Sequence, residues 1–230
     1  MRKICEMLKR KDVGAIGIGA MIVFIAMVLV AGIAASVLVQ TSTRLESQAM
    51  RTGSETIQEV ATGLAVFDIT GRKNASDIGY LAITVRPRAG AGDIDLNETV
   101  ILISEGTTKA LLTYGGHNDQ WLFNSTVCAN GELFETNMYD PTDKFTNCTS
   151  ELFGIIVLED ADSSCSQASP IINKGDKVVL TIKCDGDNLF SQEIPERTDV
   201  FGRVIPEVGS PGIISFTTPA SYSDTVYDLQ

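Results

Sequence analysis

Four asparagines in this chain have the spacing that an N-glycosylation enzyme recognises: asparagine, any residue, then serine or threonine. They are Asn74, Asn97, Asn124 and Asn147. A sugar on the side-chain amide requires that the asparagine lie at the surface of an exported protein. Each of the four falls in a loop or at the edge of a predicted strand. The sequence therefore predicts a glycosylated surface.

Cysteine chemistry is a second possibility, because the chain holds five cysteines. Cys5 lies in a basic N-terminal segment that we expect to be removed, which leaves Cys128, Cys148, Cys165 and Cys184. An even number of cysteines in an exported domain favours two disulfides, although their spacing does not choose among the three connectivities. Free buried thiols are the alternative. A zinc site is disfavoured because no Cys-x-x-Cys pair is present.

Two acidic loops offer a third kind of chemistry. Asp140 and Asp143 lie in one loop, and Asp160 and Asp162 lie in the other. Clustered carboxylates can bind Ca²⁺ through their oxygen atoms, so these aspartates are candidate ligands of a structural calcium ion. The alternative is a pair of solvated acidic loops. No other cofactor is indicated, and the single histidine, His117, has no evident metal or nucleophile partner. We therefore expect a protein that is not an enzyme.

One uncharged stretch near the start of the chain, residues 13–43, organises the rest. Ser36 is the only polar side chain between Ala15 and Val39. As a helix, residues 15–39 would span roughly 37 Å, enough to cross the roughly 30 Å hydrocarbon core of a bilayer. Residues 1–14 carry five basic and two acidic side chains. Because a basic flank stays in the cytoplasm, we expect the remainder of the chain to be exported.

The apolar stretch has more than one interpretation. Its composition is typical of a simple signal anchor. A conventional signal peptide has a shorter apolar region, about 7–15 residues, and is cleaved after it. A cut after Ala34 would fit that scheme but would discard an unusually long segment. A cut between Gly14 and Ala15 would remove only the basic leader and leave the apolar helix as the mature N-terminus.

The residues around that junction, RKDVG followed by AIGIGAMIVFIAMVLVAGIAASVLVQT, resemble the N-termini of archaeal flagellins, or archaellins. Archaellins belong to the type IV pilin-like superfamily and carry a class III signal peptide. The resemblance is close over about residues 9–50. Bacterial pilins usually have glutamate at the fifth mature position. Gly19 occupies that position here, which is in keeping with an archaellin.

The resemblance implies a processing step and a set of partners. A prepilin-type leader peptidase would recognise Arg10 and Lys11 and cut between Gly14 and Ala15. A dedicated assembly ATPase and a membrane platform would then build the filament outside the cell. The resemblance also implies that most of the four sequons carry sugars.

The predicted function is a structural subunit of the archaeal flagellum (archaellum), which polymerises through its N-terminal helix for swimming motility. The helix would first lie in the membrane, then pack with like helices, from the same or other archaellins, in the filament core. The side chains expected in that core are Ile18, Met21, Ile22, Phe24, Ile25, Val28, Leu29 and Ile33. The alternatives are a non-rotating adhesive pilus subunit and a monomeric membrane-anchored surface glycoprotein with a ligand-binding sandwich.

Charge excludes one class of partner. Without residues 1–14 the chain keeps 13 of its 18 basic residues and 27 of its 29 acidic residues, a net charge near −14. A surface this acidic repels nucleic acid, so we expect no nucleic-acid partner.

The pattern beyond the apolar stretch predicts the remaining elements. Helical spacing of apolar residues continues from Gln40 to Gly63, so we expect one helix from about Ile16 to Thr62. Short β-branched runs separated by turn residues follow. The predicted strands are Gly79–Arg86, Thr99–Ser104, Ala110–Tyr114, Gln120–Asn124, Leu152–Leu158, Lys177–Cys184, Val200–Ile205 and Ile213–Thr217.

These elements give an α+β fold: a long N-terminal hydrophobic helix followed by an all-β sandwich head that we expect to be immunoglobulin-like. The expected divisions are a cleaved leader at residues 1–14, the helix at 15–63 and the sandwich at 64–230.

Overall fold

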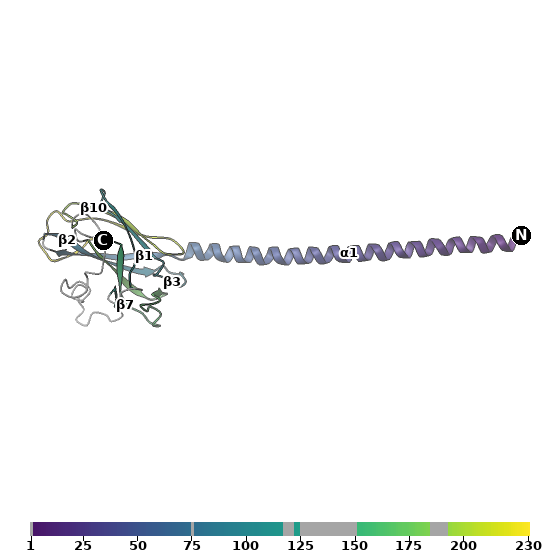
Figure 1. The fold of residues 1–230 in the computed structure, drawn as a ribbon, viewed down its shortest axis with the longest axis horizontal. Helices are drawn as coiled ribbons and strands as arrows, with labels where there is room; N and C mark the ends of the chain where they lie inside the picture. The colour runs from purple at the N-terminus through teal and green to yellow at the C-terminus, as the bar shows by residue number, and fades with distance from the viewer. Residues whose placement is uncertain (1, 75, 117–121, 125–150, 185–192) are drawn as a thin grey trace. The chain divides into compact units, whose positions relative to one another are not determined.

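The computed structural model describes residues 2–74, 76–116, 122–124, 151–184 and 193–230, with the side chains described from residue 17 onward (Figure 1). The chain divides into two compact units, residues 1–55 and residues 56–230. The first unit is helical. The second begins with the last turn of the helix and holds the β-strands.

The helix α1 spans Arg2–Ala61, which is 60 residues. It begins well before Ile16, where we expected it to start. No proline occurs before Pro87, so nothing in residues 2–61 removes a helical hydrogen bond. From Gly17 to Ala61 it is long and apolar enough to cross a membrane, and none of its most apolar window is buried within the chain. Thr62 and Gly63, both poor helix formers, follow its last residue.

A tight backbone contact fixes the start of the first strand. Ser210 N donates to the Thr62 carbonyl oxygen (2.9 Å), and Leu64 N donates to the Ser210 carbonyl oxygen (3.2 Å). Gly209 makes this approach possible. Its φ is +97°, and a Cβ there would lie 2.0 Å from the Thr62 oxygen. Only glycine fits both the left-handed backbone and the space.

The described residues of the head form twelve strands. They are β1 Leu64–Asn74, β2 Asp77–Pro87, β3 Ile94–Asp95, β4 Val100–Ser104, β5 Lys109–Tyr114, β6 Phe123–Asn124, β7 Leu152–Glu159, β8 Ile171–Ile172, β9 Lys177–Lys183, β10 Asp199–Ile205, β11 Gly212–Thr217 and β12 Val226–Asp228. Each of the eight predicted strands overlaps one of these. β1, β3, β8 and β12 were not predicted.

Two antiparallel layers account for most of the strands. One runs in the order β11-β10-β4-β5, and the other runs β7-β9-β2-β1-β12, with β6 beside β7. A short parallel pairing of β5 with β7, Thr113 opposite Leu152 and Tyr114 opposite Phe153, joins the layers into one ten-stranded sheet. β3 and β8 form a separate small pair. Figure 1 places β10 and β7 on opposite sides of the head.

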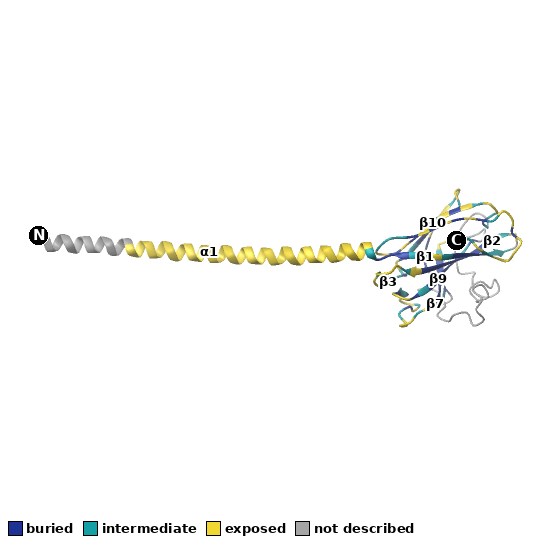
Figure 2. Ribbon diagram, turned by 180° about the vertical axis from the view of Figure 1, so that it is seen from behind, coloured by how far each residue is buried: buried dark blue, intermediate teal, exposed yellow. Residues whose placement is uncertain are grey.

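The larger of two hydrophobic clusters among the described residues lies between the two layers. Ile101, Ile103 and Val204 come from one layer, Leu81 and Leu180 from the other, and all five are fully buried in the same cluster. Figure 2 shows the buried segments inside the head and an exposed helix. The predicted helix followed by a β-structured head is confirmed, with the layers continuous through β5 and β7.

Candidate functional site

The apolar half of α1 is the largest exposed apolar surface in the described part of the chain. The eight side chains predicted for the filament core are between 54% and 68% exposed. Their neighbours around the helix are equally apolar, so no side of this segment is suited to water. A surface of this kind must be covered by lipid or by other protein chains, because exposed apolar patches of this size are rare on monomeric proteins.

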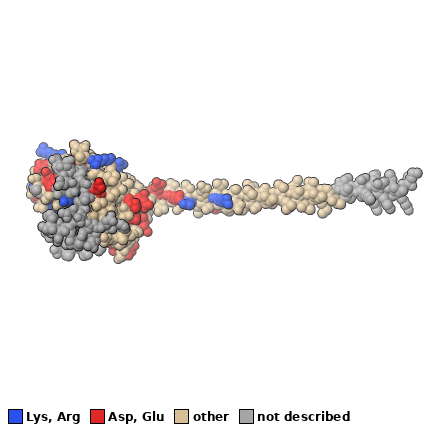
Figure 3. All heavy atoms as spheres, in the orientation of Figure 1, with Lys and Arg blue, Asp and Glu red and all other residues tan. Residues whose placement is uncertain are grey.

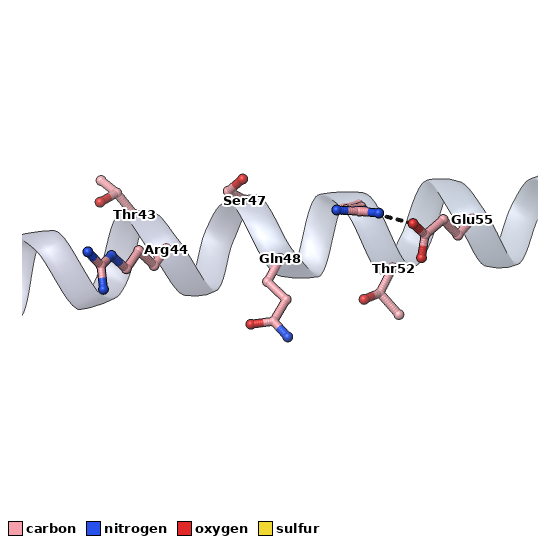
Figure 4. Close-up of a pocket in the computed structure, with 7 residues that line it drawn as sticks. Thr43, Arg44, Ser47, Gln48, Thr52 and Glu55 are labelled. Atoms are coloured by element: carbon pink, nitrogen blue, oxygen red, sulfur yellow. Dashed lines mark hydrogen bonds and ion pairs between the residues drawn. The ribbon is translucent and has the colours of Figure 1, made fainter.

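The second half of the exposed helix is polar. Thr43, Ser47, Gln48 and Thr52 line a shallow surface together with three charged residues, and all of them belong to α1 (Figure 4). Arg51 Nε lies 2.7 Å from Glu55 Oε1, one helical turn away. Both side chains are more than half exposed, so water screens the pair and its contribution to stability is small. This is an open polar surface, and it does not enclose a ligand.

The predicted cleavage junction lies within the helix. The backbone is helical through Gly14 and Ala15 and through Arg10 and Lys11. The side chains of these residues lie outside the described set. Glycines are poor helix formers, and Gly14 is followed closely by Gly17 and Gly19, so the helix is intrinsically weak on the C-terminal side of the junction.

Two sequons lie at described turns of the head. Asn74, at the end of β1, is half-buried, and its Nδ2 donates to Glu193 Oε1 (2.7 Å). Asn97, in the turn before β4, is half-buried, and its Nδ2 donates to Glu98 Oε1 (3.2 Å). The hydroxyl of its sequon partner Thr99 is fully buried and donates to the Asp95 carbonyl oxygen (3.1 Å).

The other two sequons lie partly or wholly outside the described residues. Asn124 ends β6, but its side chain is outside the described set, as is the whole of Asn147.

Two of the four candidate disulfide cysteines lie in the described part of the chain. Cys165 and Cys184 are free thiols in the structure, and both lie in the apolar core. Each packs there as a small apolar side chain. Two disulfides would need all four candidate cysteines, so the pair of disulfides stays a prediction. Burial, reinforced by the nearby Asp160 and Asp176 carboxylates, raises the pKa of Cys165 to about 12. Cys128 and Cys148 lie outside the described residues.

Three aspartates converge beside Cys165. The carboxylates of Asp160, Asp162 and Asp176 have oxygen atoms within 4.8 Å of one another. Asp160 and Asp162 were predicted from their loop, whereas Asp140 and Asp143 lie outside the described residues. Asp176 was missed. It lies 14 residues after Asp162, in the turn before β9. Only the three-dimensional structure shows that this turn lies beside the loop that holds Asp160 and Asp162.

Backbone and side-chain donors hold the three carboxylates in place. Asp160 Oδ2 accepts from Cys165 N (3.1 Å), and Asp176 Oδ2 accepts from Asn173 N (2.8 Å). Asp162 Oδ2 accepts from Asn173 Nδ2 (2.5 Å). This hydrogen bond and a second from Ser164 lower the pKa of Asp162.

One oxygen of the acidic cluster has no hydrogen-bond donor among the described residues. Asp176 is only 1% exposed, and its Oδ1 is buried without a hydrogen-bond partner among the described residues. A buried carboxylate oxygen with no donor is costly unless a cation neutralises it. Three carboxylates offer up to about six oxygen ligands, the donor type and number that Ca²⁺ prefers. The residues present therefore fit a calcium ion.

A helix with an exposed apolar half, joined to a folded β head, defines a class of protein: a subunit that assembles with copies of itself or lies in a membrane through its helix. Comparison with known proteins identifies the family within that class. Residues 14–216 match the model of the archaeal-type flagellins. The chain is 45% identical to flagellin B2 of Methanocaldococcus jannaschii over 228 residues, 99% of both chains. This chain belongs to the archaeal-type flagellin family and is a structural subunit of a filament.

Solved structures agree with this assignment. The crystal structure of archaeal flagellin FlaB1 from M. jannaschii matches with a TM-score of 0.63 and 32% identity, over 74% of this chain and 98% of that one. The archaeal flagellum of Methanospirillum hungatei strain JF1 matches with a TM-score of 0.58 over 93% of this chain and 98% of that one. Because the latter identity is 16%, that likeness concerns the fold.

Proposed function

We propose that this chain polymerises into an archaeal flagellar filament through the apolar half of α1. The observation that carries the proposal is the exposure of its large apolar side chains on all sides of the helix. Packing like helices against one another covers that surface, and each large side chain removed from water contributes roughly 1.5–3 kcal/mol. Head-to-tail contacts that do not close into a ring then produce a helical polymer. A membrane-anchored monomer would leave the same surface in lipid.

Processing between Gly14 and Ala15 is part of this proposal. The family match begins at residue 14, which supports a boundary at that point. Removal of residues 1–14 takes five basic side chains away from the end of the helix, so the helix can leave the membrane interface without carrying a cluster of charge into a packed core. N-terminal sequencing of filament protein should return Ala15.

The partners follow from the same route. A leader peptidase that reads Arg10 and Lys11, an assembly ATPase and a membrane platform would act on the membrane-inserted precursor, and the mature subunit would reside in the extracellular filament. Support comes from family membership and from a helix that is long enough to span a bilayer. Sugars on Asn74 and Asn97 would face the medium. Because the Thr99 hydroxyl is buried in the folded head, Asn97 would have to be modified before the head folds.

A charge in the apolar helix tests the proposal. Ile25→Asp places a carboxylate where the filament core should be dry, so we expect filaments to be lost from cells while the β head stays folded. Ile25→Leu is the matched control, because it keeps the volume and the apolar character. Electron microscopy of cell surfaces and near-UV circular dichroism of the detergent-solubilised chain give the two measurements. Filaments of normal number from Ile25→Asp would rule the proposal out.

A second proposed function concerns the three aspartates. We propose that Asp160, Asp162 and Asp176 bind one structural Ca²⁺, which ties the loop after β7 to the turn before β9. The observation that carries this proposal is the buried Oδ1 of Asp176, which has no hydrogen-bond donor in the described part of the chain. The residues of this chain would supply the carboxylate ligands. The ion would supply positive charge, which would neutralise the repulsion among the three neighbouring carboxylates. Calcium titration followed by calorimetry tests binding directly, and no heat of binding would refute it.

A further inference from the structure

One face of the head is more apolar than a solvated sheet face should be. The strands β11, β10, β4 and β5 alternate, so one set of side chains enters the core and the other points outward. We call the outward set the open sheet face. Its apolar members are Val100, Leu102, Leu111, Phe201, Ile205 and Ile213. An antiparallel layer packed on one side normally shows polar residues on the other.

Strand register brings these side chains together. Arg203 pairs with Leu102 on one side and with Ile213 on the other, and Leu102 pairs in turn with Leu111. The four residues form one row across four strands. In the neighbouring row, Phe201 pairs with both Ser104 and Ser215. Directly paired side chains lie about 5 Å apart and diagonal neighbours about 7–8 Å apart, so the apolar groups gather in one area of the face, with Arg203 and two serines among them.

In the opposite layer, the sheet face that points away from the main core is buried. Tyr80, Ala82, Ile156 and Val179 form a second buried cluster outside the main core, with Leu122 packed among them. β2 and β9 are thus buried on both faces. On the open sheet face the corresponding side chains stay exposed: Phe201 at 56%, Ile213 at 62% and Leu111 at 54%. Within the described residues, this layer has no cover of its own.

The charge of the open sheet face differs from that of the whole chain. It carries two cations, Arg203 and Lys109, and one acid, Asp199, which lies at the start of β10. Asp199 Oδ1 already accepts from the Thr217 hydroxyl (2.6 Å). The face is therefore weakly positive on a chain of net charge −11. Figure 3 shows basic residues gathered along one edge of the head and acidic residues elsewhere on it. The surface complementary to this face is acidic, and a second copy of this chain carries 29 acidic side chains against 18 basic ones.

The size of the face sets what it can do. Four strands about 4.8 Å apart and three rows about 7 Å apart give roughly 400 Å². A stable protein–protein contact buries about 800 Å² on each partner. The face alone is too small to hold two heads together. It is large enough to add a contact between heads that the helices already hold side by side, because tethering raises their effective concentration.

We propose that the open sheet face is a contact between subunits, which packs against an acidic surface of a second copy of this chain in the assembled filament. The proposal rests on the filament role set out above. It assigns to the head a share of the lateral contacts that the helix alone would otherwise provide.

Thiol labelling of the full chain tests whether the face is covered. Ser215→Cys places a thiol on the face with almost no change in volume, and Ala89→Cys places one on the exposed turn after β2. A fluorescent maleimide is applied to intact filaments and to filaments dissociated in detergent, with the unsubstituted chain as background. For each variant the rate of labelling in dissociated filaments is divided by the rate in intact filaments. We expect this ratio to be at least tenfold larger for Ser215→Cys than for Ala89→Cys. Equal ratios overturn the proposal.

A charge reversal gives the second measurement. Arg203→Glu should lower the temperature at which filaments dissociate, because it sets an acid on the face against an acidic partner. Arg197→Glu makes the same change at an exposed site outside the face. If Arg203→Glu shifts dissociation no more than Arg197→Glu does, the proposal is overturned. Absence of filaments from the unsubstituted chain would instead refute the filament role, so the two failures are distinct.

Discussion

At the scale of single residues, the head places three carboxylates close enough to repel one another and buries a thiol whose pKa is raised as a result. Asp160, Asp162 and Asp176 share a space in which three negative charges repel one another. Cys165 lies beside them, buried, with its pKa raised. Sequence placed Asp160 and Asp162 in one acidic loop. It could not reveal Asp176, because the contact between that loop and the turn before β9 depends on strand pairing far apart in the chain.

Asp176→Asn should have opposite effects with and without calcium. With Ca²⁺ present, the substitution removes a ligand, and the head should melt at a lower temperature than the parent chain. In excess chelator it removes a buried charge that repels two others, so melting should be unchanged or higher. For the parent chain, Ca²⁺ at 100 times its dissociation constant should add about 2.7 kcal/mol of stability. Thermal melts in both buffers give the comparison. A parent chain that melts identically in both would contradict the calcium site.

The buried thiol of Cys165 should make the head sensitive to alkali. Its pKa is raised from 9.0 to about 12, so the folded state keeps the proton that the unfolded state loses. The stabilisation from this group is complete below pH 9 and is lost as the pH rises toward 12. Denaturant unfolding at pH 8 and pH 11 should show a smaller loss of stability in Cys165→Ala than in the parent chain. A free-thiol assay at pH 8 should find Cys165 and Cys184 unreactive until the head is unfolded.

At the scale of elements, sequence patterns predicted what is locally encoded. The apolar run predicted the long helix, and β-branched runs bounded by turns predicted eight strands. The strand β1 was not predicted because its pairing with β2 is irregular. Register shifts after Val66 and Arg72 break the alternation of apolar residues. β3, β8 and β12 are two or three residues long, too short for any periodic pattern. The order of strands across the sheet follows from long-range pairing, which no local pattern encodes.

The contact between the end of α1 and the loop before β11 should depend on Gly209. Gly209→Ala forces a side chain into a backbone with φ of +97° and against the Thr62 oxygen. We expect a loss of at least about 2 kcal/mol in unfolding free energy, since the strain alone costs about 1–2 kcal/mol. Gly106→Ala is the matched control, because its φ is +96° but nothing lies within 4 Å of the added carbon. Equal losses from the two substitutions would show that the close approach is unimportant.

At the scale of the whole molecule, the chain separates two tasks. The head folds around its own core and presents an acidic surface to water, whereas the helix has apolar side chains that are exposed in the described part of the chain. Like-charged heads repel weakly in salt, and screened surface charge pairs contribute under about 1 kcal/mol each. The helix supplies the larger driving force for assembly. The open sheet face adds to it once the helices have brought the heads together.

The most direct test of this account is the assembly state of a chain that begins at Gln40 and so lacks the apolar half of α1. It should be a soluble monomer with a folded head, measured by light scattering and circular dichroism, and it should form no filaments under electron microscopy. Filaments of native width from that shortened chain would contradict the claim that the apolar helix holds the polymer together.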